Sequence, residues 1–437
     1  MTVTQIGRKL GLALLLLLTG VGGPAFAQEG PAWPPHDVPV AMPQGQAAAA
    51  PPESLIEAGE LLTGRGQELR NTRILVKDGK IAAVGPNLTA PGAVIYDLRN
   101  ATVMPGLIDV HVHLLRHFGP NGKAEDGRET QTQFALGVVN NLWVTLMAGF
   151  TTVQSVGDPQ DEVFREYVKE GIIPGPRVLT SYHDIYGSPR VGDDDVLRAK
   201  VDLLKYEHAD LVKIFASDSI RDGGRPILTL HQLQVLCGEA NRVGLRTLVH
   251  AYNGSVHNAI VAGCTEVEHG TGGTQADVDL MAKKGTYYDP QMGLVVQNYV
   301  RFKQQFSGNG DYNAAGFTRM EAQPAINGRL FNEARRAGVK LVMGTDAVAG
   351  AFGHQADEII ARVKLGQSVM DAIDDATAVN AESLRLGKEI GSVAAGYDAD
   401  IIAVDGDPLT DATRLRQVSF VMKAGTVYKN TVSAAGR

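Results

Sequence analysis

Residues 103–116 read VMPGLIDVHVHLLR, an apolar run that carries Asp109, His111 and His113 at every second position. Side chains two apart on a β-strand point to the same face, so both imidazoles of such a strand can reach one metal ion. Asp109 shares that face and is expected deeper, accepting a hydrogen bond. A lone His-x-His pair fits two hydrogen-bonded structural histidines equally well, so the rest of the chain must decide.

The middle of the chain alternates short apolar runs with longer helix-like segments. Strands are expected near residues 107–113, 149–155, 177–181, 210–215, 246–251, 265–269, 285–288 and 340–346. This alternation favours a parallel sheet in an α/β protein. Eight strand–helix units over about 285 residues fit a (β/α)8 TIM-like barrel at 105–390. A doubly wound open sheet is the competing fold.

Segments rich in β-structure bracket this region. Residues 73–85 (RILVKDGKIAAVG) hold two short strands around an Asp-Gly turn, which is a strong hairpin signal. Residues 398–408 and 417–430 show similar runs broken by glycine-containing turns. Because chain ends often lie close together, residues 53–104 and 391–437 are expected to form one small β-sandwich domain.

The N-terminus resembles a secretory signal peptide. Arg8 and Lys9 precede the apolar run GLALLLLLTG, and AFA ends at residue 27. A charged start, a short apolar core and an Ala-x-Ala site indicate cleavage after Ala27. The apolar run is too short for an ordinary membrane span, although an uncleaved anchor is the alternative. Residues 28–52, rich in Pro and Ala, are expected to form a mobile lead-in. We therefore expect a periplasmic or secreted protein without a stable membrane anchor.

Composition narrows the class of protein. The chain has 437 residues, is 44% hydrophobic and carries a net charge of −7 without a basic run. It can therefore bury a large core, and a nucleic-acid partner is not expected. The chain has two cysteines, Cys237 and Cys264, which could form one disulfide bond. The sequence does not decide whether the protein is a homo-oligomer.

Polar side chains stand at the ends of later strands, where a barrel of this kind carries its function. His250 ends the fifth strand (TLVHAY), His269 the sixth (TEVEHG) and Asp346 the eighth (LVMGTDA). Each alone has an ordinary explanation, a structural histidine or a helix-capping aspartate. As a set with the first two histidines, they supply the imidazole and carboxylate ligands of zinc and similar ions.

Lys213 lies among apolar residues in the fourth strand (ADLVKIFAS). A buried ammonium is costly, so such a lysine is either paired, snorkels outwards or loses its proton. A neutral amine can add carbon dioxide to give a carbamate that bridges two metal ions. The four histidines, Lys213 and Asp346 could hold two metal ions and still leave room for a water that both ions share.

The segments PGLIDVHVHL, LVKIFAS, TLVHAY, TEVEHG and MGTDA, in this order, resemble the amidohydrolase superfamily. The resemblance spans about residues 54–430 and includes the flanking hairpin and the closing GSVAAGYDADIIAVDGDPL. Within the superfamily, the chain is similar to the imidazolonepropionase-like group, which includes metal-dependent Xaa-Pro and Xaa-Lys/Arg dipeptidases and ochratoxin-type amidases. This implies a binuclear metal barrel with a β-sandwich domain.

The resemblance also implies roles for individual side chains, with zinc as the default metal and manganese or cobalt as alternatives. The implied ligands are His111 and His113 on one ion, His250 and His269 on the other, carboxylated Lys213 bridging both, and Asp346 on the first. Hydroxide produced at the metals would attack an amide carbonyl, and Asp346 would pass a proton to the leaving amine. Tyr252 is the candidate donor to the oxyanion, with a packing role as its alternative.

The substrate-binding residues are marked less clearly. The candidates are His183, Tyr186 and Arg190 in SYHDIYGSPR, and His354 in AGAFGHQADEI. Arg190 could bind a substrate carboxylate bidentately, or be a solvated loop arginine. The first loop departs from the Gly- and His-rich loop of many relatives, and the second has His-Gln in place of His-Gly. Because of these two differences, the resemblance alone does not identify the substrate of this protein.

The expected reaction is cleavage of an amide bond in a dipeptide or an N-acyl or aryl-acyl amino acid, ochratoxin-like amides included. The alternative is a cyclic-amide hydrolase or deaminase of the same superfamily that uses one metal. Lys213 argues against it, because mononuclear relatives that deaminate generally lack this lysine. A non-catalytic binding protein would be expected to have lost a ligand, and all six ligands are present.

Overall fold

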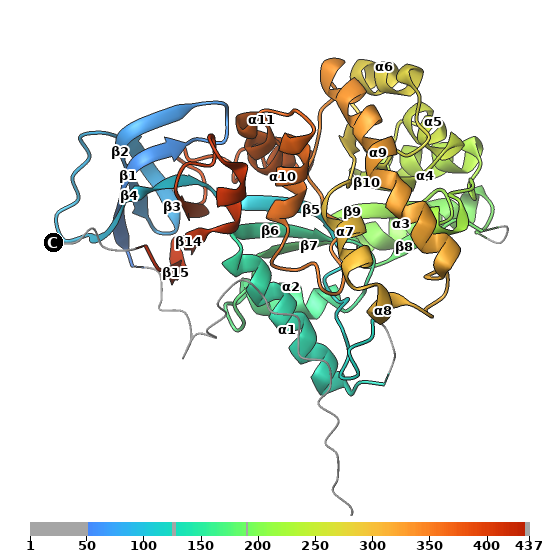
Figure 1. The fold of residues 1–437 in the computed structure, drawn as a ribbon, viewed down its shortest axis with the longest axis horizontal. Helices are drawn as coiled ribbons and strands as arrows, with labels where there is room; N and C mark the ends of the chain where they lie inside the picture. Colours follow the sequence, from blue (N-terminus) through green and yellow to red (C-terminus); the bar gives the residue numbers. More distant parts are fainter. Residues whose placement is uncertain (1–50, 125–127, 189–190, 433–437) are drawn as a thin grey trace, which may run out of the picture.

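The computed structural model describes residues 51–124, 128–188 and 191–432. The expected signal peptide, nearly all of the lead-in and Arg190 lie outside these residues. Figure 1 shows two lobes, with strands from the beginning and the end of the chain gathered in one and the remaining strands and most helices in the other. Among the described helices, none is both long and apolar enough to cross a membrane.

Both ends of the chain build a single seven-stranded sheet. Its order is β15-β14-β13-β4-β1-β2-β3. The strands are β1 (Glu53–Leu62), β2 (Glu68–Lys77), β3 (Lys80–Gly85), β4 (Val94–Pro105), β13 (Ile401–Asp405), β14 (Val418–Lys423) and β15 (Thr426–Asn430). Strands β4 and β13 join the two ends, with Val103 opposite Ala403.

The strands of the predicted β-sandwich domain are hydrogen-bonded into this one sheet. An isolated bridge joins Lys80 of β3 to Asp398, just before β13, so the outer strand returns towards the other half. Apolar side chains from six of the strands share one core, which includes Ile56, Ile74, Ile81, Val103, Ile401 and Phe420. One sheet can enclose this core because it bends back on itself.

The second lobe contains two parallel sheets. The first has the order β5-β6-β7 and the second β12-β11-β10-β9-β8. Their strands are β5 (Leu107–Val112), β6 (Phe150–Ser155), β7 (Arg177–Thr180), β8 (Asp184–Tyr186), β9 (Leu211–Phe215), β10 (Arg246–Ala251), β11 (Glu266–His269) and β12 (Tyr287–Asp289). Strand β8 was not expected from the sequence.

Helices follow the strands of this lobe and cover them (Figure 1). They are α1 (Gln131–Met147), α2 (Asp161–Lys169), α3 (Asp194–Tyr206), α4 (Leu230–Val243), α5 (Gly254–Val261), α6 (Gln275–Lys284), α7 (Leu294–Arg301), α8 (Lys303–Phe306), α9 (Ala314–Arg336), α10 (Ala356–Lys364), α11 (Val369–Asp374) and α12 (Asn380–Ser383). Side-chain caps fix several starts, such as Thr229, which accepts a hydrogen bond from Gln232 N at the start of α4.

The expected eighth strand near 340–346 is not formed as a strand. In this described segment, Leu341 makes a single bridge to Tyr288 of β12, and Ala347 makes one to Val112 of β5. The segment therefore lies between the free edges of the two sheets. Its backbone still bonds to both neighbours, because Val342 N donates to Tyr288 O (3.0 Å) and Asp346 N to His111 O (2.8 Å). Side chains take two further N–H groups, with Met343 N donating to Asn380 Oδ1 (2.8 Å) and Thr345 N to Asp109 Oδ1 (3.0 Å).

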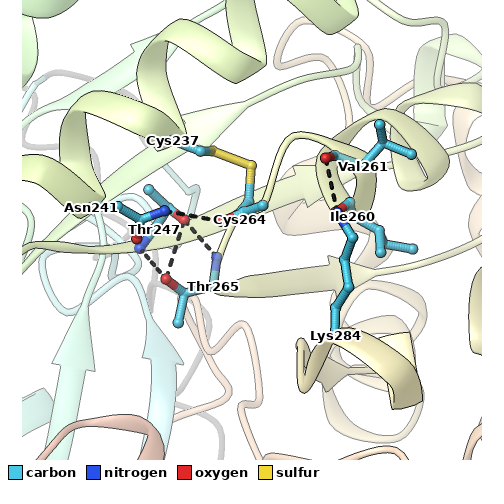
Figure 2. The surroundings of a disulfide bond; sticks show 9 residues. Cys237, Asn241, Thr247, Ile260, Val261, Cys264, Thr265 and Lys284 are labelled. Atoms are coloured by element: carbon cyan, nitrogen blue, oxygen red, sulfur yellow. Dashed lines mark hydrogen bonds between the residues drawn. A yellow bond between two sulfur atoms is a disulfide. The ribbon is translucent and has the colours of Figure 1, made fainter. Parts of the chain in front are cut away.

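A disulfide joins Cys237 in α4 to Cys264, two residues before β11 (Figure 2). Both cysteines are buried. Next to the bond, Thr265 N donates to Thr247 Oγ1 at 2.7 Å, which ties the start of β11 to β10. The disulfide thus fastens an outer helix to the strands that carry His250 and His269.

Replacing both cysteines by alanine is expected to lower the free energy of unfolding by about 3 kcal/mol. The bond closes a loop of 27 residues, and such a cross-link removes chain entropy from the unfolded state. Urea denaturation followed by circular dichroism measures the change. A reductant should destabilise the wild type and leave the double variant unaffected, and equal midpoints for both proteins would contradict the expectation.

Candidate metal and active site

Parallel strand ends bring the predicted side chains together. His111 and His250 lie one residue before the ends of β5 and β10, His269 ends β11, and Lys213 is central in β9. They share a cavity of about 450 Å³ with His113, Asp346 and Tyr252. The structure therefore gathers all seven predicted metal and catalytic residues in one place.

The first group surrounds the Asp346 carboxylate. Its Oδ1 lies 3.1 Å from His113 Nε2 and 3.5 Å from His111 Nε2. Lys213 Nζ lies 3.3 Å from His111 Nε2. The ligand atoms of His111, His113 and Asp346 all lie within 4.8 Å of one another. One ion could thus contact all three, with the lysine beside it.

The second group is a pair of facing imidazoles. His269 Nε2 lies 2.9 Å from His250 Nδ1. The other ring nitrogen, His250 Nε2, is buried and has no hydrogen-bond partner among the described residues. The Tyr252 ring stacks on His269 at 4.9 Å and meets His250 edge-on at 4.8 Å. A buried nitrogen without a partner is costly unless a ligand satisfies it.

Burial sets the charge of these groups. It lowers the pKa values of His111, His250 and His269, so the imidazoles are neutral, as metal ligands must be. Burial also lowers the pKa of Lys213, which the charge of Glu268 opposes. A lowered pKa favours the neutral amine that carbamate formation requires.

The pKa of Asp346 shifts so that the charged form is favoured, whereas the histidines and Lys213 shift towards their neutral forms. Burial alone would raise its pKa, but the hydrogen bond from His113 and the electrostatic interactions with the rings of His111, His113 and His269 outweigh burial and leave the pKa well below the usual value. The carboxylate is therefore ionised. Neutral imidazoles, an ionised carboxylate and the close approach of His250 Nδ1 to His269 Nε2 together fit divalent metal ions.

Two of these groups lie on strained backbone. The φ angle is 61° at His269 and 52° at Asp346. Positive φ at a non-glycine residue costs on the order of 1 kcal/mol or more, and such residues cluster at functional sites. Tyr288 Oη donates to His269 O at 3.0 Å and helps to hold the first conformation.

Asp109 holds the conformation around Asp346. Thr345 donates to it twice, from N to Oδ1 at 3.0 Å and from Oγ1 to Oδ2 at 2.6 Å. These bonds confirm the expectation that Asp109 lies deeper and accepts hydrogen bonds. Burial raises its pKa to about 7. Asp109 therefore fixes the residue that precedes Asp346 without lining the cavity.

A buried polar cluster beneath the site was not predicted. His111 Nδ1 contacts Glu268 Oε2 and Gln291 Nε2. Gln291 Nε2 also donates to Asp289 Oδ2 at 2.9 Å, and Arg362 Nη2 donates to Asp289 Oδ1 at 3.0 Å. The cluster orients the His111 ring so that Nε2 faces Asp346, which is how outer carboxylates commonly orient ligating histidines.

The substrate-binding candidates have different positions. Tyr186 lines the cavity and packs on Phe215. His183 does not, because its Nε2 lies 3.6 Å from Glu207 Oε2 on a partly exposed surface. Strand β8 explains the difference, since its alternation aims Asp184 and Tyr186 at the cavity. His354 lies in the turn before α10 and is also absent from the cavity wall.

The sequence reasoning missed further residues of the site. Glu268 could have been found, because Glu266 and Glu268 alternate with valine in a strand and so face its polar side. Arg362 gave no such signal, since it is a buried arginine in the amphipathic helix α10. The cavity-lining residues Arg221, Tyr299 and Tyr312 lie outside the β-strands, where periodicity does not mark them.

Comparisons with known proteins agree with this arrangement. The sequence profile of the Amidohydrolase family matches residues 102–433. Ochratoxinase from Aspergillus niger is 26% identical over 435 residues, covering 86% of each chain. The crystal structure of a Xaa-Pro dipeptidase with bound methionine is 28% identical with a TM-score of 0.78, covering 86% of this chain and 100% of that one. A dihydroorotase from Bacillus thuringiensis is 40% identical over 82 residues, which is 19% of this chain and 16% of that protein.

The family match extends from β4 past β15 and thus includes the strand ends that carry the site. The superfamily resemblance drawn from the motifs is confirmed. The chain belongs to the amidohydrolase family, in its ochratoxinase- and dipeptidase-like group, and is a hydrolase of amide carbon–nitrogen bonds.

Proposed function

We propose that this protein is a periplasmic or secreted binuclear amidohydrolase that cleaves the amide bond of a dipeptide or of an N-acyl or aryl-acyl amino acid. The observation that carries the proposal is the convergence of four histidines, Lys213 and Asp346 on one cavity. The similarity to ochratoxinase and to a Xaa-Pro dipeptidase supports this substrate class, ochratoxin-like amides included. The secretory location rests on the N-terminal sequence.

The proposal includes a closed (β/α)8 barrel as the scaffold. Residues 341–347 bridge β12 and β5, which supports closure on one side. On the other side, Asp210 N donates to Thr180 O at 2.9 Å, linking the start of β9 to the end of β7. Such a barrel would place every site residue at its C-terminal face.

We assign His111 and His113 to one metal ion, His250 and His269 to the other, and a carboxylated Lys213 to both. Zinc suits these ligands, and manganese or cobalt would fit the same set. Bound ions of this kind supply a Lewis acid for the carbonyl and lower the pKa of water. The proton transfers and the hydrogen bond to the carbonyl oxygen are then carried out by side chains of the protein.

Asp346 is placed to move the proton of the reaction. Its ionised carboxylate accepts a proton from the attacking water, and the same oxygen then gives the proton to the leaving nitrogen. Tyr252 is buried, and burial raises its pKa, so its phenol stays protonated. A protonated phenol on the cavity wall can donate a hydrogen bond to the carbonyl oxygen as negative charge develops there.

A second candidate is a cyclic-amide hydrolase or deaminase that uses one metal. The short match to a dihydroorotase favours it. The buried position of Lys213 beside His111 favours two ions instead, because a lysine has no ligand role in a mononuclear site of this kind.

Metal analysis of the purified protein is expected to give about two divalent ions per chain. A screen of dipeptides, N-acyl amino acids and ochratoxin A, with zinc supplied, should find amide hydrolysis. Chelation should abolish this hydrolysis and zinc should restore it, because neutral imidazoles and the carbamate have no hydrolytic role without the ions. Full activity with one ion per chain would contradict the binuclear proposal.

A further inference from the structure

Arg221 stands on the cavity wall in the short 3-10 turn Ile220–Asp222 that follows β9. Its side chain is only 19% exposed. An arginine is always charged, so a mostly buried one needs compensation from its surroundings. The compensation that the structure shows comes from one carboxylate and two aromatic rings.

One edge of the Arg221 guanidinium is held by Asp311. Arg221 Nε donates to Asp311 Oδ1 at 2.8 Å. The flat face lies on tyrosine, with the guanidinium carbon 4.1 Å from the ring centre of Tyr312 and 5.7 Å from that of Tyr299. These contacts fix both the position and the plane of the guanidinium, because Arg–aromatic stacking restricts the plane and the Nε bond restricts rotation within it.

The outer end of the same group remains available. Among the described residues, Asp311 is the single hydrogen-bond partner of the Arg221 guanidinium, and it contacts Nε. Nη1 and Nη2 together form the fork that matches a carboxylate bidentately. The other arginine on the wall, Arg116, already has an interaction of its own.

We propose that Arg221, oriented by Asp311, Tyr299 and Tyr312, is the residue that binds the free carboxylate of the substrate and thereby determines the preference for an amine part with an unblocked carboxyl group. This inference rests on the proposed function and names the residue behind its specificity. Asp311 is a positioning residue, and Tyr299 and Tyr312 form the aromatic walls of the same subsite. Both dipeptides and N-acyl amino acids meet this requirement, whereas their carboxamides do not.

The test compares substrates that differ only at this carboxyl group. Glycyl- and N-benzoyl-L-amino acids are assayed beside their carboxamides, with release of glycine or benzoate as the signal. The wild type should favour the free acid by about 100-fold in kcat/KM, the usual scale for a charge-assisted bidentate bond. In Arg221→Met this preference should disappear through a higher KM for the acid, with the carboxamide rate changed less than about threefold.

Arg225→Met is the matched control. Arg225 lies in the same loop, is 77% exposed, pairs with Asp218 and does not line the cavity. It should keep the wild-type preference. Because Arg221→Met leaves Asp311 without its cation, the double variant Arg221→Met/Asp311→Asn provides a charge-balanced protein in which the same loss of preference is expected.

Three results would overturn the inference. They are a wild type that hydrolyses acid and carboxamide equally, an Arg221→Met variant that loses the same factor on both, and a double variant that keeps the preference. In each case amide hydrolysis itself persists, so the proposed function stands. A wild type that is loaded with metal and hydrolyses no amide in either series would overturn both proposals.

Discussion

Replacing Lys213 with alanine is expected to lower kcat/KM by on the order of 1000-fold or more, and to reduce the metal content below two ions per chain. Lys213 is fully buried, its Nζ lies 3.3 Å from His111 Nε2, and its surroundings lower its pKa. In the proposed site, the variant loses the side chain that we assign to both metal ions. Steady-state kinetics and metal analysis of the same preparations measure the two effects.

Small carboxylic acids provide the sharper part of this experiment. If the lysine acts as a carbamate, then acetate or propionate can enter the space left by the side chain and restore part of both metal content and rate. Lys340→Ala is the control, since Lys340 is a half-exposed lysine paired with Glu382 and should behave as wild type. A Lys213→Ala protein with two ions and normal turnover would refute the bridging role.

The second large effect is expected from Asp346→Asn, which should lower kcat by on the order of 1000-fold while substrate binding changes only a few-fold. The amide keeps the shape of the side chain but cannot take up the proton. The amide oxygen can take the place of Asp346 Oδ1, 3.1 Å from His113 Nε2, so the local structure should persist.

Stopped-flow binding and steady-state kinetics separate the two quantities for Asp346→Asn. Asp357→Asn is the matched control, because Asp357 pairs with Arg416 away from the cavity. An Asp346→Asn enzyme with wild-type kcat would exclude Asp346 as the base. A variant that has lost its metal would show a ligand role instead, and metal analysis distinguishes that case.

Alternation in the sequence carried most of the information about the site. His111 lies in β5 and His113 directly follows it, while His250 and His269 stand at or next to the ends of β10 and β11, so the parallel strands bring them together. Seven expected strands are present within the described residues as β5–β7 and β9–β12. Glycine-containing turns between β-rich runs located β2, β3 and β13–β15, whereas β1 and β4 were not identified individually.

What the sequence did not reveal depends on contacts between distant residues. The segment near 340–346 has a strand-like composition and bonds to the backbone of Tyr288 and His111. Asn380 and Asp109 accept hydrogen bonds from two of its N–H groups, which interrupts a regular strand. Arg221 resembles any loop arginine until Asp311, about 90 residues later, meets it. The sequence alone does not distinguish His183 from the residues that follow it. The alternation of side chains along β8 shows that Asp184 and Tyr186 face the cavity and that His183 does not.

The sheet shared by both ends of the chain has a consequence for biosynthesis. Val103 of β4 pairs with Ala403 of β13, so the inner edge of β4 has no partner until the ribosome has made some 300 further residues. Closing so long a loop carries an entropic cost and slows folding. The nascent chain thus keeps this edge unpaired until β13 (Ile401–Asp405) has been made, near the end of translation.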